Sequence, residues 1–300
     1  MATKTSAKKP KALTWPNGKK VAVSVTVMFE TWPDDSAPNY SVQTTHLKKG
    51  TVDHAAKAWS TYGGRVGVWR IMRMLERLGI PATFFVNARC TEQYPDAVKQ
   101  IVKSGFDIAA HSYTQDDLPS YYTPEEQRGL IRKSIDLLEG CGGKKVTGWG
   151  SPVVAFTPET AGLLKQAGLH WTCDVTYVDL PIKIQTPHGP IAGVPTTDFS
   201  DNRVLRASSR DLFDVHRGTF DYLRQNESIG LQTLVIHCQF GGRPLISAVL
   251  TELFKHMQKS RDAWFTTHEA LADWALKQDV DEHTYRSRYF DRPTSLKTKR

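Results

Sequence analysis

The pattern of apolar and polar residues along this chain has two periods, one typical of strands and one typical of helices. Runs rich in β-branched and aromatic residues predict strands at 21–29, 82–86, 106–110, 146–149, 170–174, 231–237 and 263–266. Between these runs, apolar residues at helical spacing predict helices at 66–78, 94–104, 123–138, 157–167, 209–225, 245–258 and 268–277. From 175 to 197 the pattern loosens, and only short extended pieces are expected there.

The ends of the predicted helices carry start and stop signals. Gly79 and Gly105 follow two of the helices, where glycine adopts the left-handed conformation that ends a helix. Thr123 and Thr157 each begin a helix with a capping hydroxyl, a proline in the first turn and an early acid. Strands separated by helices every ~25 to 35 residues predict parallel βαβ units. About seven strands suit a single α/β domain, a distorted (β/α)7-type barrel with all strand C-terminal ends on one face.

The composition changes on either side of this barrel, which we place at 21–277. Residues 1–20 are expected to form a basic flexible tail, and residues 278–300 a polar C-terminal extension. Within the barrel, residues 33–64 are rich in Pro, Ser, Thr and Gly, which predicts a long loop near the site.

The net charge of +8 is concentrated at the two ends of the chain. Residues 1–12 carry four lysines and no acid, and residues 281–300 carry six Lys/Arg against three acids. The remainder is close to neutral, which argues against a nucleic-acid-binding core, because such a core needs a basic stripe on its folded surface. Packing of the charged ends on a neighbouring subunit would suit a homo-oligomer.

Membrane insertion and disulfide bonding are not expected. No apolar run approaches the ~20 residues that span a bilayer, and the N-terminus lacks the apolar segment of a secretory signal. The four cysteines have no CxxC spacing, so reduced thiols in a cytoplasmic enzyme are the simplest interpretation.

The chemistry is expected at the strand ends, which in a barrel meet on one face. Any one of these side chains could simply hydrogen-bond within the barrel. Two histidines and two carboxylates arriving independently favour an active site. These strand ends deliver Glu30, His111, Trp149 with Ser151, Asp174 and His237.

Motifs at three strand ends resemble the polysaccharide deacetylase (NodB homology) superfamily. Phe29-Glu30-Thr31 is similar to its aromatic–acid–acid motif, His111-Ser-Tyr-Thr-Gln115 to its His-Ser/Thr-x-x-His pair, and Leu234-Val-Ile-His237 to the strand that ends in its catalytic histidine. The resemblance runs from about residue 21 to 276 and implies a distorted barrel of about seven strands.

A closer likeness is to metal-independent allantoinases and related cyclic-amide hydrolases. Tyr62-Gly-Gly-Arg-Val-Gly-Val-Trp-Arg70 resembles that subgroup's Tyr-Gly-x-Arg-x-Gly-x-Trp-Arg. Further similar motifs occur in the same order: Ile80-Pro-Ala-Thr-Phe-Phe85, Gly148-Trp149, Asp179-Leu-Pro181 and Gly242-Arg-Pro244.

The departures from the family concern the metal. Metal-using members hold a divalent cation with an acid and two histidines, and those positions here are Thr31, His111 and Gln115. A hydroxyl and a neutral amide are poor replacements for zinc ligands. No cofactor is therefore expected, and the alternative is zinc or another divalent metal held by Glu30, His111 and His237. The arginine of the family's Arg-x-Pro motif is also replaced, because Gly150-Ser151-Pro152 stands there.

Without a metal, amide hydrolysis needs a base, an oxyanion stabiliser and an acid for the leaving nitrogen. We assign Glu30 as the base and His237 as the acid, with His111 donating to the oxyanion or positioning the water. Candidate substrate-binding residues are Tyr113, Gln115, Trp149, Ser151, Asp174, Gln239 and Arg243.

The first hypothesis is a metal-independent hydrolase of C–N bonds in a small amide, ureide or cyclic imide. Neutral hydrogen-bonding groups and flat apolar walls suit such a small molecule. The alternatives are a metal-dependent deacetylase of N-acetylated sugars and a catalytically degenerate ligand-binding member.

Overall fold

The computed structural model describes residues 12–44, 47–197, 199–204 and 208–290. Their strands form one curled sheet in the order β6-β7-β5-β4-β3-β2-β1-β8, and β9 also pairs with β1. The strands are β1 (Val21–Phe29), β2 (Thr83–Val86), β3 (Asp107–Ala110), β4 (Gly148–Trp149), β5 (Trp171–Thr172), β6 (Ile182–Ile184), β7 (Ile191–Gly193), β8 (Gly230–His237) and β9 (Ala263–Thr266).

Strand β1 is the centre of this sheet. β8 runs parallel to nearly its whole length on one side. On the other side β9 pairs with its first half and β2 with its last four residues. Alternate residues of β1 face two different cores, as Val23 packs under the outer helices and Ala22 points into the barrel. β1 is therefore buried on both faces over nearly its whole length.

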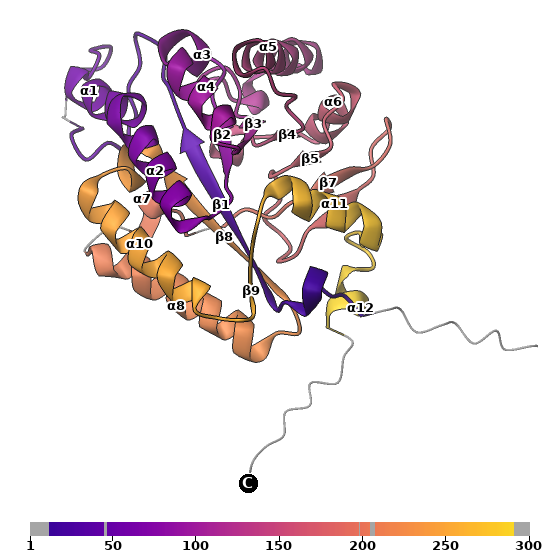
Figure 1. Cartoon of the computed structure of the whole chain (residues 1–300). Coiled ribbons are helices and arrows are strands. Elements are labelled where there is room, and N and C mark those ends of the chain that lie inside the picture. Colours follow the sequence, from indigo (N-terminus) through magenta and orange to yellow (C-terminus); the bar gives the residue numbers. More distant parts are fainter. Residues whose placement is uncertain (1–11, 45–46, 198, 205–207, 291–300) are drawn as a thin grey trace, which may run out of the picture.

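Helices surround the outside of the curled sheet, with α2, α10 and α8 on one flank and α11 on the other (Figure 1). The main helices are α1 (His54–Tyr62), α2 (Val68–Leu78), α4 (Pro95–Lys103), α5 (Pro124–Gly142), α6 (Thr160–Gln166), α8 (Ser209–Asn226), α10 (Pro244–Gln258) and α11 (His268–Gln278). Shorter pieces are α3 (Cys90–Gln93), α7 (Asp201–Val204), α9 (Cys238–Gly241) and α12 (Tyr285–Tyr289), the 3₁₀ turns η1 (Pro16–Gly18), η3 (Pro119–Tyr121) and η4 (Pro152–Val154), and the π-helix η2 (Gly63–Gly67).

The expected single α/β domain with a distorted barrel is confirmed. The structure also shows where the barrel is left open. β6 and β7 form an antiparallel hairpin at one end of the sheet, within the segment where only short extended pieces were expected. Among the described residues β8 has no strand partner on its outer side. Across this opening the Thr233 hydroxyl of β8 donates to the Pro195 carbonyl oxygen at 3.1 Å.

Three expected boundaries need correction. The stretch 33–64 is a loop only in part, because helix α1 begins at His54. At the predicted N-terminal tail, residues 1–11 lie outside the described residues, but Trp15 is buried and its indole N–H donates to the Gly230 carbonyl oxygen at 3.0 Å. In the predicted polar extension, Tyr285 and Tyr289 of α12 are buried, while residues 291–300 lie outside the described residues.

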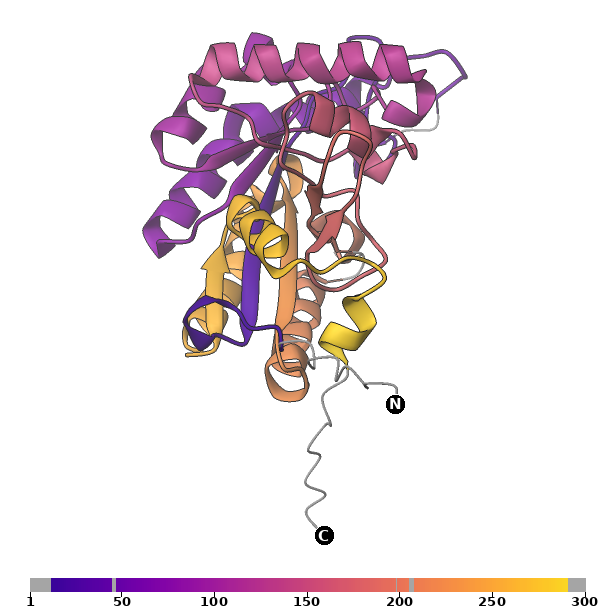
Figure 2. The ribbon, with the colours of Figure 1, turned by 90° about the vertical axis from the view of Figure 1, so that its right-hand side faces the viewer.

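The described N-terminal turn η1 and helix α12 both lie at the end of the molecule opposite to the C-terminal end of β1 (Figures 1 and 2). The C-terminal end of β1 is therefore remote from both segments. In the part of the chain described here, none of the helices combines the length and apolar character needed to cross a bilayer.

Candidate active site

Three strand ends bring Glu30, His111 and His237 together, as the sequence predicts. Glu30 follows β1, His111 follows β3 and His237 ends β8. The Glu30 Oε1 atom lies 3.9 Å from His111 Nε2 and 3.7 Å from His237 Nε2. All three side chains are buried. These separations exceed direct hydrogen bonds, so the three polar atoms surround a small common space.

The Glu30 carboxylate is held by its other oxygen. Oε2 accepts hydrogen bonds from the Tyr40 hydroxyl at 2.9 Å and from the Gln239 amide at 2.7 Å. Gln239 was predicted to bind substrate, and it instead contacts the predicted base. Tyr40 comes from the loop after β1. Both bonds leave Oε1 directed at the two histidines.

His237 is bound to a buried carboxylate that the sequence patterns did not reveal. Its Nδ1 lies 2.5 Å from Asp201 Oδ1, while Asp201 Oδ2 accepts the backbone N–H groups of His237 at 2.8 Å and Gly241 at 3.1 Å. Burial would lower the pKa of His237, but the negative charges of Asp201 and Glu30 outweigh it and raise the pKa to about 9. At neutral pH His237 is therefore cationic, and its Nε2–H is a donor.

The protonation state of His111 differs from that of His237. Its Nδ1 lies 2.6 Å from the Gly150 carbonyl oxygen, which can only accept, so Nδ1 carries a proton. Burial is the main influence on its pKa and lowers it below the ordinary value, so the ring is neutral at neutral pH. Its Nε2 is then an acceptor. Of the two roles expected for His111, positioning water fits this tautomer and donation to an oxyanion does not.

A cavity of about 510 Å³ opens in front of these residues. The predicted binding residues Gln115 and Ser151 line it, as do Glu30, His111 and His237. On its rim Val153 and Val154 have positive φ angles of 48° and 59°. β-branched residues rarely adopt this conformation, and such strain concentrates at functional sites.

Asp174 and Trp149 support this cavity from behind. Asp174 accepts the Ser151 backbone N–H at 2.8 Å and the Ser151 hydroxyl at 2.7 Å, and the Trp149 indole N–H reaches the same hydroxyl at 3.0 Å. Burial raises the pKa of Asp174 to about 6. Both residues therefore position Ser151 and are absent from the cavity lining.

Tyr113 and Arg243 lie away from the cavity. The Tyr113 hydroxyl donates to the Glu92 carboxylate at 3.1 Å. The Arg243 guanidinium stacks 3.7 Å from the centre of the Tyr62 ring and donates to the Gln239 carbonyl oxygen at 3.1 Å. Arg243 thus braces the short helix α9 that carries Gln239, and neither Tyr113 nor Arg243 lines the cavity.

Asn87 is another site residue that sequence reasoning missed. Its Oδ1 accepts the Thr31 backbone N–H at 2.9 Å and its amide donates to the His111 carbonyl oxygen, which ties the ends of β1 and β3 together. It directly follows β2, so the strand-end rule applied to the predicted strand 82–86 would have found it. Asp201 carried no such signal, because it lies in a four-residue helix between the loose stretch 175–197 and the predicted helix 209–225.

The donor set around His111 does not fit a divalent metal. Among the described residues no group of three His, Cys, Asp or Glu is arranged to hold one. The neighbouring side-chain oxygens come from Thr31 and Gln115, and both atoms are buried without a hydrogen-bond partner in the described part of the chain. In the alternative set of Glu30, His111 and His237, a metal would have to displace the proton that Asp201 and Glu30 favour on His237.

Comparison with known proteins agrees with this geometry. The polysaccharide deacetylase family model matches residues 54–172. A peptidoglycan deacetylase-like protein of Gibberella zeae is 34% identical over 126 residues, which cover 40% of this chain and 37% of that relative. The structure of a probable polysaccharide deacetylase from Pseudomonas aeruginosa PAO1 has a TM-score of 0.78 at 24% identity, covering 88% of this chain and 93% of that one.

A Puue allantoinase structure is similar over as much of the chain. Its TM-score is 0.79 at 26% identity, covering 89% of this chain and 94% of that one. The family match over residues 54–172, the curled sheet and the three strand-end motifs thus make the chain similar to the polysaccharide deacetylase (NodB homology) superfamily, with a resemblance to an allantoinase within it.

Proposed function

We propose that this protein hydrolyses the C–N bond of a small amide, ureide or cyclic imide without a metal. One observation carries the proposal. A carboxylate oxygen, a neutral imidazole nitrogen and a cationic imidazole N–H face one another across 3.7–3.9 Å in Glu30, His111 and His237. A base, an acceptor and an acid are thus present together.

These three groups match the hydrogen-bonding capacity of one water molecule. A water among them donates to Glu30 Oε1 and His111 Nε2 and accepts from His237 Nε2–H. Glu30 removes a proton as this water attacks the carbonyl carbon. His237, whose charge Asp201 sustains, stabilises the developing oxyanion and then protonates the leaving nitrogen. Proton transfer from Glu30 to His237 restores the starting state.

The cationic His237 supplies positive charge where metal-using relatives would place a Lewis acid. A ring that is strained or electron-poor needs less activation than a simple acetamide. This lower requirement offsets the weaker activation that His237 gives compared with a metal ion. The cavity of about 510 Å³ lies within the roughly 300–1,000 Å³ range of small-molecule sites. Homo-oligomer formation and a cytoplasmic location stay predictions.

A metal-dependent deacetylase of N-acetylated sugars is the second candidate, because the family match and the Gibberella zeae relative point to deacetylation. The degenerate ligand-binding alternative is less consistent with the site. Ligand binding alone does not require a buried Asp201 that keeps His237 protonated beside a second carboxylate.

The test is an assay of chelated protein against cyclic imides, ureides and N-acetyl sugars. Turnover of a ring substrate should survive chelation, and Glu30→Gln should lower kcat by about 10³-fold or more because the base is lost. Glu76→Gln, an exposed change on α2, should leave kcat unchanged. Activity only on N-acetyl sugars, abolished by chelation, would favour the deacetylase. No turnover of any substrate would support the degenerate alternative.

A further inference from the structure

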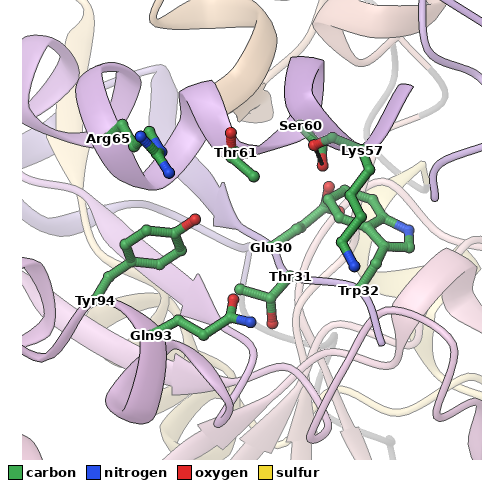
Figure 3. Close-up of a pocket in the computed structure, with 9 residues that line it drawn as sticks. All are labelled: Glu30, Thr31, Trp32, Lys57, Ser60, Thr61, Arg65, Gln93 and Tyr94. Atoms are coloured by element: carbon green, nitrogen blue, oxygen red, sulfur yellow. Dashed lines mark hydrogen bonds between the residues drawn. The ribbon is translucent and has the colours of Figure 1, made fainter. Parts of the chain in front are cut away.

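A second pocket, whose lining includes Glu30 but neither histidine, lies beside the first cavity (Figure 3). We call it the Arg65 pocket. Its volume is about 310 Å³, and its walls come from the end of β1, α1, η2 and the α3–α4 turn. Glu30 is common to both cavities, whereas the histidines line only the first. The residues of the Arg65 pocket are Glu30, Thr31, Trp32, Lys57, Ser60, Thr61, Arg65, Gln93 and Tyr94.

Thr31, Arg65 and Tyr94 can offer hydrogen-bond donors to the Arg65 pocket, whereas the Ser60 and Thr61 hydroxyls donate to backbone carbonyl oxygens of α1. Figure 3 shows the Thr31 and Gln93 side chains reaching toward each other, with the Tyr94 hydroxyl on the Arg65 side. The Thr31 hydroxyl is buried and has no hydrogen-bond partner among the described residues. A hydroxyl buried without a partner is costly, and a ligand that accepts its proton would relieve the cost.

The charges favour an anion in the same place. No described residue forms an ion pair or hydrogen bond with the Arg65 guanidinium, which offers five N–H donors and no acceptor. Lys57 adds a second cation, partly offset by Asp34 at 3.6 Å. The acid in the wall, Glu30, is engaged by Tyr40 and Gln239 on Oε2 and faces the histidines with Oε1.

Packing does not account for Arg65, although it accounts for its neighbours in the Tyr62–Arg70 motif. The Tyr62 hydroxyl donates to the Gly242 carbonyl oxygen at 3.1 Å, and Arg70 donates to the same oxygen. Gly67 leaves no room for a Cβ against the Cys238 carbonyl. Of the motif's residues, Arg65 is the one that lines the Arg65 pocket, and it also borders a second groove together with Val66, Trp69 and Arg70.

We propose that the Arg65 pocket binds a small oxyanion or carboxylate, held by the Arg65 guanidinium and the hydroxyls of Thr31 and Tyr94. Planar guanidinium donors suit such anions. The anion could be a free inorganic ion or the carboxylate that amide hydrolysis releases. The shared chemistry defines the site, and binding measurements can separate the two sources.

The test is thermal denaturation of the full chain with inorganic phosphate, sulfate or acetate, with chloride holding the ionic strength constant. Phosphate should raise Tm saturably, because a ligand that binds only the native state stabilises it. Arg65→Gln should weaken the apparent affinity about tenfold or more, since a charge-assisted contact is lost. Thr31→Val should weaken it less. Arg77→Gln, an exposed change on α2 that lies outside the pocket, should behave as the parent protein.

Saturation by acetate but not by phosphate or sulfate would identify the carboxylate as the ligand, and the reverse would identify the inorganic ion. Absence of a saturable shift, or equal affinities in Arg65→Gln and Arg77→Gln, would overturn the proposal. Because the readout is binding, these outcomes are independent of whether the protein turns over any substrate.

Discussion

At the scale of single residues, the site depends on two imidazole rings held in different charge states. Burial keeps His111 neutral, and the Gly150 carbonyl oxygen fixes its proton on Nδ1. The Asp201 carboxylate keeps His237 protonated, in spite of burial. Titratable groups with pKa values pushed apart are the usual arrangement by which one site supplies both an acceptor and an acid near neutral pH.

Replacing Asp201 with Asn should therefore change the pH dependence as well as the rate. His237 in the parent loses its proton as pH rises through about 9, so kcat/KM should fall there. In Asp201→Asn the larger of the two negative charges that raise the pKa of His237 is gone, so the alkaline limb should move to lower pH. We expect kcat to fall by about 10²-fold or more, since less of the acid is protonated at neutral pH.

The stability of the protein should also decrease as pH rises through the pKa of His237. The raised pKa of His237 stabilises the fold below about pH 6.5, and this contribution is lost as pH rises through about 9. Urea denaturation at pH 6 and pH 9.5 should thus show a larger loss for the parent than for Asp201→Asn. Asp211→Asn, a change at the N-terminus of α8, serves as control. An alkaline limb that stays in place in Asp201→Asn would contradict the assigned role.

The sequence could predict Glu30, His111 and His237 because each directly follows a recognisable strand. It could not reveal Tyr40 or Asp201, because each reaches the site from a loop or from a four-residue helix without a periodic pattern. The tautomer of His111 also depends on tertiary structure, since its partner carbonyl belongs to Gly150 at another strand end.

At the scale of elements, the glycines of the Tyr62–Arg70 motif explain how η2 can pack against α9. A Cβ on Gly67 would overlap the Cys238 carbonyl oxygen, and a Cβ on Gly242 would overlap Gly67 in return. This close approach positions Gln239, which binds Glu30 at 2.7 Å. The motif is therefore structural support for the base.

Gly67→Ala should destabilise the protein and impair catalysis together. The added methyl must displace backbone, so we expect a loss of about 3 kcal/mol or more in the free energy of unfolding, measured by urea denaturation. Gly129→Ala is the matched control, because a Cβ there meets nothing within 4 Å on the exposed face of α5. It should stabilise by about 0.5–1 kcal/mol. Equal effects at the two positions would show that the close approach is unimportant.

The presence or absence of local sequence signals explains which elements could be predicted. Helix α5 has a capping box at Thr123 and ends at Gly143 in the left-handed conformation, and both are local signals. Helix α1 was missed because it follows a stretch rich in turn-forming residues, although Asp53 caps it by accepting the Ala56 N–H at 3.0 Å. The two three-residue strands of the β6–β7 hairpin are too short to show a period.

At the scale of the whole molecule, the segment before β1 seals the barrel at the end opposite to the site (Figure 1). The Trp15 ring packs 4.3 Å from the ring of Trp274, whose indole N–H donates to the Thr14 carbonyl oxygen at 2.9 Å. Trp15 itself donates to Gly230 at the start of β8. One side chain thus joins the N-terminal segment, α11 and the central strands.

Trp15→Ala should consequently lower the stability of the protein without changing its kcat/KM. Trp15 is 2% exposed, so the change leaves a large cavity and should lower the free energy of unfolding by about 3–5 kcal/mol. Trp69→Ala, at a tryptophan that is 40% exposed on α2, should cost much less. Because Trp15 lies at the far end of β1 from Glu30, kcat/KM of the folded fraction should be unchanged at a temperature well below its Tm. A fall in kcat/KM without loss of stability would show instead that the closed end of the barrel and the strand ends that carry the site are coupled.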